Sequence, residues 1–263
     1  MVGQKHLFEN LRKYSIDNFP HALMLIGDFG CGKHTFVKYM SDYLNIKSID
    51  ITCNLNLSLL DEITIGTIPH IYLIDGSEIT LKEQNIILKF LEEPRENCFI
   101  VIIGENKAQF LPTILNRCQI WNFQNYSIEE LREFNNFEDI NVDILKLAKT
   151  PGRLKILKDY PLTEADVLSN KIIDKLKVAN IANALTLYDK IPLITVDTKI
   201  YFRLFVDILI KNLTYRIIEN KDDSYYLWYY KIIDLRKKSN MPKIDIKYLF
   251  ENFVSDMWQE VNK

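Results

Sequence analysis

Residues 71–118 read IYLIDGSEITLKEQNIILKFLEEPRENCFIVIIGENKAQFLPTILNRC, and this stretch decides the fold that the sequence predicts. Its first four residues are apolar and lead into Asp75, and residues 98–103 form a second apolar run of mostly β-branched and aromatic side chains. Short apolar runs of this kind are typical of buried parallel strands. Open parallel sheets bind ligands at the carboxyl ends of their strands, so Asp75 is a candidate ligand for a Mg²⁺ ion on a nucleotide.

The segment between the two runs has the pattern of a helix. Thr80 stands three residues before Glu83, which is the spacing of a capping box. Apolar residues then recur at helical intervals until Pro94, which ends the helix. The stretch therefore predicts a strand, a helix and a second strand.

A phosphate-binding loop is predicted upstream of this unit. Apolar residues 23–26 are followed by GDFGCGKHT at residues 27–35 and then by an amphipathic helix. The spacing fits a Walker A motif, in which backbone N–H groups surround phosphates and Lys33 reaches the outer phosphates. The fit fails at His34, which replaces Ser or Thr. Two interpretations stay open: a loop that binds nucleotide without efficient turnover, and a strand, turn and helix that bind no nucleotide.

The remaining patterns predict three domains. We expect an α/β P-loop domain over residues 1–125, with a five-stranded parallel sheet and helices on both faces. A small helical lid follows over residues 126–161, where Ser127 and Glu130 have a second capping-box spacing. Residues 162–263 carry wide apolar stripes at helical intervals and predict an all-α domain. The fourteen residues at 54–67 are harder to assign and fit one short helix and a turn.

Composition limits the classes of function. The 263 residues carry a formal net charge of −2, so any contact with nucleic acid must be local, which counts against a stand-alone DNA-binding protein. Four cysteines, at positions 31, 53, 98 and 118, form no C-x-x-C pair, which argues against a zinc site and against disulfides and favours a reducing cytoplasm. No apolar run approaches the roughly 18 residues of a membrane span, so we expect a soluble protein.

An aromatic cluster in the C-terminal part allows two interpretations. Its members are Tyr225, Tyr226, Trp228, Tyr229 and Tyr230. Aromatic side chains can stack on the bases of single-stranded nucleic acid. Aromatic residues on every face of one helix more often pack between neighbouring helices, and we favour that interpretation.

Four segments together resemble the bacterial clamp-loader AAA+ family of DNA polymerase III, and the delta-prime subunit more than the gamma/tau motor. These segments are VGQ at residues 2–4, the loop at residues 27–35, QNIILKFLEEP at residues 84–94 and LPTILNRC at residues 111–118. The resemblance covers roughly the first half of the chain. It implies an AAA+ P-loop domain, a helical lid and a C-terminal helical collar that assembles subunits.

The resemblance also implies roles for individual residues. Arg117 matches the arginine finger, which acts in trans on the γ-phosphate of a nucleotide bound to a neighbouring subunit, although Asn116 replaces the Ser that precedes it in the family. The nucleotide-binding residues that it implies are Gln4 at the base, Gly27, Gly30, Gly32, Lys33, His34 and Thr35 in the loop, Asp75 at Mg²⁺, and Arg153 in the lid.

Two departures from the family bear on catalysis. Gly76 follows Asp75 where a motor subunit has its catalytic Glu, and glycine has no side chain to position water. With His34 in the loop, this predicts a site for ATP and Mg²⁺ that is weak or vestigial, and an enzyme assignment that leans toward no intrinsic ATPase. Glu78 is a possible substitute base. The zinc module that many family members carry is absent, because residues 45–69 hold only Cys53.

The resemblance thus implies a stator in a hetero-oligomeric ring. Its expected partners are gamma/tau-like motor and delta-like subunits, a sliding clamp and primer–template DNA, with no membrane. One alternative is an active motor subunit of the same family. Another is an AAA+ replication initiator or helicase loader, which would call for a basic or helix-turn-helix C-terminal domain.

Overall fold

The computed structural model forms two compact units, Met1–Ile156 and Leu157–Lys263. It describes residues 3–56, 68–77, 79–93, 96–134, 140, 142–177, 185–193, 198–220, 224–239, 241 and 244–261. Most of the segment that was hard to assign, residues 57–67, lies outside the described residues. Each unit is described below by itself.

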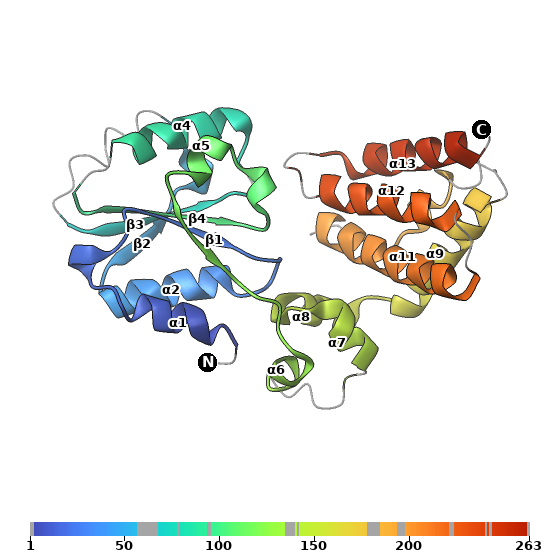
Figure 1. Cartoon of the computed structure of the whole chain (residues 1–263), viewed down its shortest axis with the longest axis horizontal. Helices are drawn as coiled ribbons and strands as arrows, with labels where there is room; N and C mark the ends of the chain where they lie inside the picture. Colours follow the sequence, from blue (N-terminus) through green and yellow to red (C-terminus); the bar gives the residue numbers. More distant parts are fainter. Residues whose placement is uncertain are drawn as a thin grey trace. The chain divides into compact units, whose positions relative to one another are not determined.

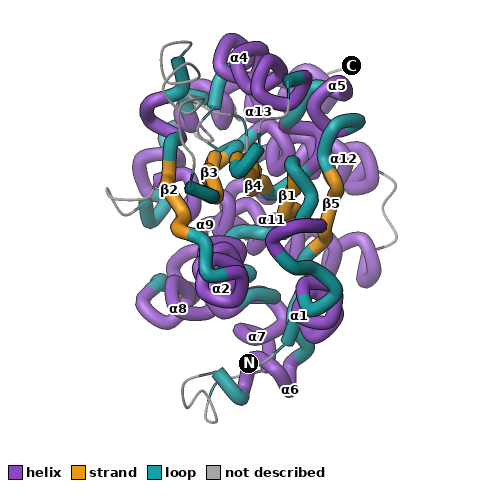
Figure 2. The backbone as a smooth tube through the Cα atoms, turned by 90° about the vertical axis from the view of Figure 1, so that its left-hand side faces the viewer, coloured by secondary structure: helices purple, strands orange, loops and turns teal. Residues whose placement is uncertain are grey.

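The first unit is built on a parallel sheet of five strands. These are β1 (Ala22–Ile26), β2 (Lys47–Asp50), β3 (His70–Asp75), β4 (Cys98–Gly104) and β5 (Gln119–Asn122). Their order is β2-β3-β4-β1-β5, and every pairing is parallel (Figure 2). The predicted sheet is confirmed. The strand β2 ends at Asp50, whose carboxylate accepts hydrogen bonds from the N–H and hydroxyl of Thr52 at the start of a 3-10 turn.

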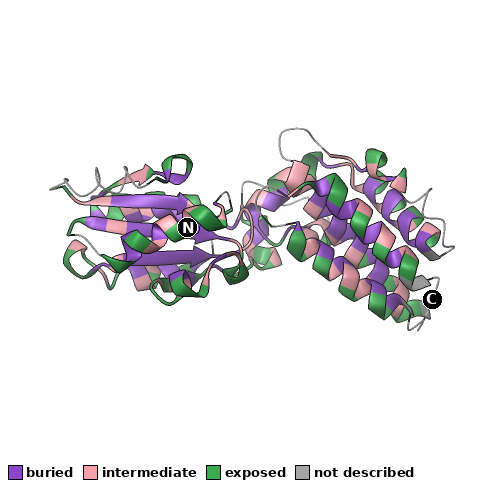
Figure 3. Ribbon diagram, turned by 90° about the horizontal axis from the view of Figure 1, so that it is seen from above, coloured by how far each residue is buried: buried purple, intermediate pink, exposed green. Residues whose placement is uncertain are grey.

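Helices cover both faces of this sheet, as predicted. The helices α1 (Lys5–Leu11) and α2 (Lys33–Leu44) lie on one face, and α4 (Leu81–Glu92) and α5 (Pro112–Leu115) lie on the other (Figure 1). The three central strands, β1, β3 and β4, are almost wholly buried, whereas the edge strands β2 and β5 are partly exposed (Figure 3).

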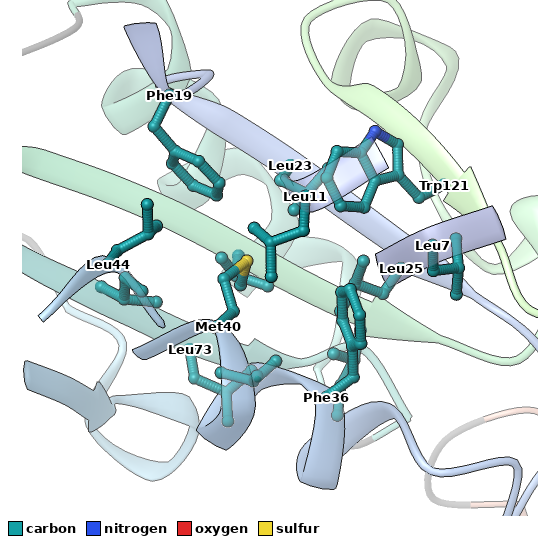
Figure 4. Close-up of a cluster of buried hydrophobic side chains, with 14 of the residues drawn as sticks. Leu7, Leu11, Phe19, Leu23, Leu25, Phe36, Met40, Leu44, Leu73 and Trp121 are labelled. Carbon is teal, nitrogen blue, oxygen red and sulfur yellow. The ribbon is translucent and has the colours of Figure 1, made fainter. Parts of the chain in front are cut away.

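Successive side chains of a strand point to opposite faces of the sheet, so the hydrophobic core has two parts, one on each face. Leu23 and Leu25 of β1 pack with the helices α1 and α2, whereas Met24 packs with α4. Figure 4 shows the first cluster, in which Phe36 and Met40 of α2 point toward the sheet. Because both faces of β1 are buried, the strand reads as an unbroken apolar run in the sequence.

The predicted capping boxes are both present. The hydroxyl of Thr80 accepts a hydrogen bond from the N–H of Glu83 at 3.4 Å, and the Glu83 carboxylate accepts one from the N–H of Thr80 at 2.5 Å. The same reciprocal pair joins Ser127 and Glu130 at the start of α6 (Ile128–Arg132). These local hydrogen bonds satisfy backbone donors that the first turn of a helix leaves free.

Three short helices follow the sheet. They are α6, α7 (Val142–Ala148) and α8 (Pro151–Asp159), and the contacts group most of this segment, up to Ile156, with the sheet. A separate lid over residues 126–161 therefore stays a prediction. The two compact units divide within α8.

The second unit is helical in its described parts, as predicted. Its longer helices are α9 (Leu162–Lys177), α11 (Thr198–Asn220), α12 (Ser224–Lys238) and α13 (Ile246–Val261). The helix α11 packs on α9 and α12, and α13 packs on α12 and α9, which closes a small bundle. Its core contains predicted stripe residues such as Phe202, Phe205, Phe250 and Met257.

The aromatic cluster of α12 divides between core and surface. Tyr225 and Trp228 are buried, with exposed fractions of 2% and 3%, whereas Tyr226 and Tyr230 are exposed at 51% and 69%. The Trp228 ring meets Tyr225 edge-on, with ring centroids 5.4 Å apart. Trp228 is therefore a packing residue, and a stacking platform that includes its indole is wrong.

Among the described residues, no helix is long and apolar enough to cross a membrane. The same part of the chain holds no group of three or more His, Cys, Asp or Glu side chains placed to bind a metal ion.

Candidate functional site: a phosphate loop and an arginine

The predicted phosphate loop connects the central strand β1 to α2. Gly30 and Gly32 have φ angles of 75° and 100°, in the left-handed region that favours glycine. These two residues turn the chain sharply, so that α2 begins at Lys33, directly after the loop. The Walker A spacing has therefore folded as a strand, a tight loop and a helix N-terminus.

Lys33 turns back onto its own loop. Its ammonium group donates hydrogen bonds to the carbonyl oxygens of Gly27 at 2.5 Å and Asp28 at 3.0 Å. It also lies 3.7 Å from the Cys31 sulfur. The lysine stays next to the loop, where it can bind a phosphate only by sharing or leaving these carbonyl partners.

His34 and Asp75 form a pair at the predicted metal position. The Nε2 atom of His34 lies 3.3 Å from Oδ2 of Asp75, and Oδ1 of Asp75 accepts hydrogen bonds from the N–H and hydroxyl of Ser77 at 2.9 and 2.6 Å. The hydrogen bond to Asp75 raises the pKa of His34. Burial alone would raise the pKa of Asp75, but the hydrogen bonds from His34 and Ser77 lower it overall.

This donor set does not fit Mg²⁺. The ion prefers six oxygen ligands in an octahedron and keeps several waters, whereas here an imidazole and a serine already occupy both oxygens of Asp75. Thr35, the alternative hydroxyl, is exposed in the first turn of α2. A Mg²⁺ ion at Asp75 would compete with these hydrogen bonds for the carboxylate, and the metal role of Asp75 stays a prediction.

The position of the missing catalytic glutamate is filled by a ring that the sequence did not suggest. A Cβ atom on Gly76 would lie 2.2 Å from Cζ of Phe110 and 2.8 Å from the carbonyl oxygen of Ile103. The Phe110 ring is buried and also blocks a Cβ on Gly104, at 2.4 Å. The signal that could have pointed to a large side chain here is a pair of glycines at the ends of neighbouring strands, Gly76 directly after β3 and Gly104 as the last residue of β4. Glu78, the candidate substitute base, lies outside the described residues.

Gln4 holds the N-terminal segment against the chain that follows β5. Its side-chain amide donates to the carbonyl of Gln124 at 2.6 Å and accepts from the N–H of Gln124 at 3.0 Å. The residue is buried, with 8% of its surface exposed. Its predicted contact with a nucleotide base stays a prediction, and it would have to compete with this pair of hydrogen bonds.

The tip of the loop rests on the start of α8. The Thr150 hydroxyl donates to the carbonyl of Phe29 at 2.7 Å, and the N–H of Gly152 donates to the carbonyl of Gly30 at 3.0 Å. A Cβ on Gly30 would lie 2.6 Å from the Cα of Gly152, so the two backbones touch. Arg153 is the next residue and is buried, with 6% exposed. The backbone of Arg153 thus lies beside the loop, and the predicted contact of its side chain with a nucleotide stays a prediction.

Arg117 follows α5 and is held by its own chain. One terminal nitrogen donates to the carbonyl of Thr113 at 3.0 Å, and the other lies 2.9 Å from a carboxylate oxygen of Glu92 at the end of α4. The side chains of Arg117 and Glu92 are 37% and 51% exposed. Arg117 is therefore a solvent-accessible charge with a carboxylate partner.

Comparisons with known proteins agree with the motifs. A family model described as "DNA polymerase III, delta subunit" matches residues 64–127, which include Asp75, Gly76 and Arg117. The chain is 29% identical to DNA polymerase III subunit delta′ of Haemophilus influenzae over 111 residues, which are 41% of this chain and 32% of that protein. It is 25% identical to DNA polymerase III subunit tau of Bacillus subtilis over 159 residues, 47% of this chain and 28% of that protein.

A solved structure is also similar. It is a DNA polymerase III gamma subunit-related protein from Thermotoga maritima, with 14% identity, a TM-score of 0.40, and coverage of 97% of this chain and 99% of that chain. The chain spans about a third of the length of the two curated relatives it matches. Its resemblance to the clamp-loader subunits of bacterial DNA polymerase III, the delta-prime subunit among them, is thereby confirmed.

Proposed function

We propose that the chain is a delta-prime-like subunit of a DNA polymerase clamp loader. It holds its place in a ring of different subunits, hydrolyses no ATP itself, and donates Arg117 in trans to a nucleotide on the neighbouring motor subunit. The ring loads a sliding clamp at primer–template DNA during replication in the cytoplasm. Its partners are gamma/tau-like and delta-like subunits.

The contact between Gly76 and Phe110 carries this proposal. Hydrolysis needs a group that positions the attacking water, and residue 76 has neither a side chain nor space for one. The pair of His34 and Asp75 independently removes the usual hydroxyl and carboxylate ligands of Mg²⁺. A chain that keeps the fold of a phosphate loop without these two parts fits a role next to a motor better than the role of a motor.

The exposure of Arg117 supports its proposed role as an arginine finger. An arginine finger stabilises the charge of the transferring phosphoryl group and is worth about 10³–10⁵ in rate. The guanidinium of Arg117 is exposed and is retained only by a carbonyl and a surface carboxylate. Surface ion pairs of this kind are worth about 0–1 kcal/mol, so a phosphate on another subunit can take over the guanidinium.

An active motor is the second candidate. It would need a water-positioning group from elsewhere, and the contact of Phe110 with Gly76 disfavours it. A replication initiator or helicase loader is a third candidate. It is disfavoured because it would call for a basic or helix-turn-helix C-terminal domain, which the aromatic-rich helices of mixed charge do not suggest.

The experiment compares two variants in a ring reconstituted with the motor subunits from the same cell. Arg117→Ala should lower the ATPase and clamp-loading rates by about tenfold or more, while the chain's own folding is unchanged. Lys33→Ala should lower these rates much less, because in this proposal no ATP is hydrolysed at the loop that contains Lys33. Arg132→Ala, at an exposed arginine of α6, is the matched control. A ring that tolerates Arg117→Ala but is disabled by Lys33→Ala would make this chain a motor.

A further inference from the structure

The two sides of the phosphate loop differ in what they could receive. The strand β1 leads into the loop, with β4 and then β3 on one side and β5 on the other. Asp75, which the resemblance implies near the outer phosphates, ends β3, so a nucleotide in that orientation would have its outer phosphates on this side of the loop. The nucleoside part of a nucleotide would therefore have to leave the loop on the side of β5.

Tyr126 occupies the β5 side. Its hydroxyl donates to the carbonyl of Cys31 in the loop at 3.0 Å. Its ring lies against the N-terminal segment, because a Cβ on Gly3 would be 2.4 Å from Cε1 and 2.8 Å from Cδ1 of the ring. The same hydroxyl would lie 3.8 Å from a Cβ on Gly32. The tyrosine thus bridges the N-terminal segment and the loop at the residues just before α2.

The surroundings hold the ring in this place. The N–H of Tyr126 donates to the carbonyl of Lys149 at 3.0 Å, and Phe134 meets the ring edge-on with centroids 5.8 Å apart. Burial raises the pKa of Tyr126 to about 12, so the phenol remains a neutral donor to the Cys31 carbonyl at physiological pH. Both the backbone and the ring of Tyr126 are therefore fixed by contacts within the first unit.

Neither wall beside the ring can easily retreat. Gln4 ties the N-terminal segment to Gln124 through two hydrogen bonds. The loop tip is held to Thr150 and Gly152, where the backbones already touch. A base that entered on this side would have to displace the ring itself.

We propose that Tyr126 fills the volume that the nucleoside of a bound nucleotide would need. The loop then excludes the nucleoside and accepts, at most, phosphate groups. The inference rests on the proposed function in one respect, which is that the loop descends from a nucleotide site. It adds a specificity-determining residue that the family resemblance does not supply.

The test measures binding of ADP and of inorganic pyrophosphate to the purified full chain by calorimetry. The wild-type chain should bind ADP no more tightly than pyrophosphate, because the nucleoside contributes nothing. Tyr126→Ala should strengthen or create ADP binding by about tenfold or more, because the nucleoside can enter the vacated volume, and should leave pyrophosphate binding unchanged. Tyr126→Phe, which keeps the ring, should resemble the wild type.

Two results would overturn the inference. One is a wild-type chain that binds ADP at least ten times more tightly than pyrophosphate. The other is a folded Tyr126→Ala chain with the same relative affinities as the wild type, including no binding of either ligand. If Tyr126→Ala does not fold, Tyr126→Leu keeps apolar packing against Gly3 and removes the reach to Cys31. The outcome is independent of Arg117, so failure here leaves the ring experiment untouched, and failure there leaves this one untouched.

Discussion

The ring of Phe110 lies where any side chain on Gly76 would begin, with a Cβ there only 2.2 Å from Cζ of the ring. The absence of a catalytic glutamate is thus accompanied by a space already filled. A single substitution at residue 76 cannot restore the missing group without displacing a buried aromatic ring.

We therefore predict that Gly76→Glu yields no ATPase and destabilises the first unit. Overpacking of a core costs about 1–3 kcal/mol, to which the buried carboxylate adds. Urea unfolding and phosphate release measure the two effects. Combining Gly76→Glu with Phe110→Ala makes room for the new side chain, so the double variant should be more stable than the sum of the two single changes implies. A folded Gly76→Glu chain with wild-type stability and new ATPase activity would contradict this prediction, because it would show that the Phe110 side chain can move aside freely.

Glu92→Gln should leave the fold intact and should not lower the ATPase activity of the reconstituted clamp-loader ring. The pair of Arg117 and Glu92 is exposed, so its loss should change the free energy of unfolding by less than about 1 kcal/mol. The carboxylate competes with phosphate for the guanidinium, so the reconstituted ring should hydrolyse ATP at the wild-type rate or faster. A rate as low as that of Arg117→Ala would mean instead that Glu92 orients the finger.

Gly152→Ala should loosen the contact between the loop and α8. A Cβ on Gly152 would lie 2.5 Å from the Cα of Gly30, so the two backbones would have to separate to make room for it. We expect a loss of about 1–3 kcal/mol in the free energy of unfolding. Gly30→Ala should cost at least as much, because residue 30 also has a left-handed φ of 75°.

The two glycine changes should also be coupled. Once either methyl group has separated the backbones, the second has less contact to lose, so the double variant should lose less stability than the sum of the single losses. Strict additivity in denaturant unfolding would contradict a shared contact.

The pair of His34 and Asp75 should make stability depend weakly on pH. The pKa of His34 is raised above 6.5 in the folded chain, so the folded state holds this proton more tightly than the unfolded state. The stabilisation is fully present below about pH 6.5 and is lost as the pH rises through the folded pKa. The pKa of Asp75 is lowered below 3.8, so its share is present above that pH and is lost as the pH falls further.

His34→Gln isolates this effect. The difference in unfolding free energy between wild type and variant should be larger at about pH 5.5 than at about pH 8.5, by at most about 1 kcal/mol because His34 is largely exposed. In an Asp75→Asn background the same difference should not change with pH. A difference that grows toward alkaline pH would reverse the assigned sign.

Substitution of Trp228 should lower the free energy of unfolding of the second unit far more than substitution of Tyr226. Trp228→Ala removes a buried indole and should cost about 3–5 kcal/mol, whereas Tyr226→Ala should stay within about 0.5 kcal/mol. Chemical unfolding followed by circular dichroism compares them. A negligible effect of Trp228→Ala on stability would contradict burial of the indole and would again allow it to stack on nucleic acid.

Local patterns were sufficient for the elements of the fold. Apolar runs gave the strands, and the spacing of Thr80 and Glu83 predicted the start of α4, because a capping box depends on four consecutive residues. The Walker A spacing likewise placed the loop and the start of α2. The prediction that His34 and Gly76 replace catalytic groups likewise rests on residue types alone.

What occupies the site could not be predicted, because its contacts join residues far apart in the chain. Gln4 pairs with Gln124, 120 residues away, and Tyr126 reaches Cys31 across 95 residues. The choice of Phe110 to fill the space above Gly76 depends on how two strand ends and a turn meet. The spacing of apolar residues in the sequence does not predict such contacts, since they form only when the parallel strands bring their carboxyl ends to one edge of the sheet. Residue types thus predicted which catalytic groups this chain lacks, and only the packing of the sheet showed that the Phe110 ring lies against Gly76 and that Tyr126 lies against the loop.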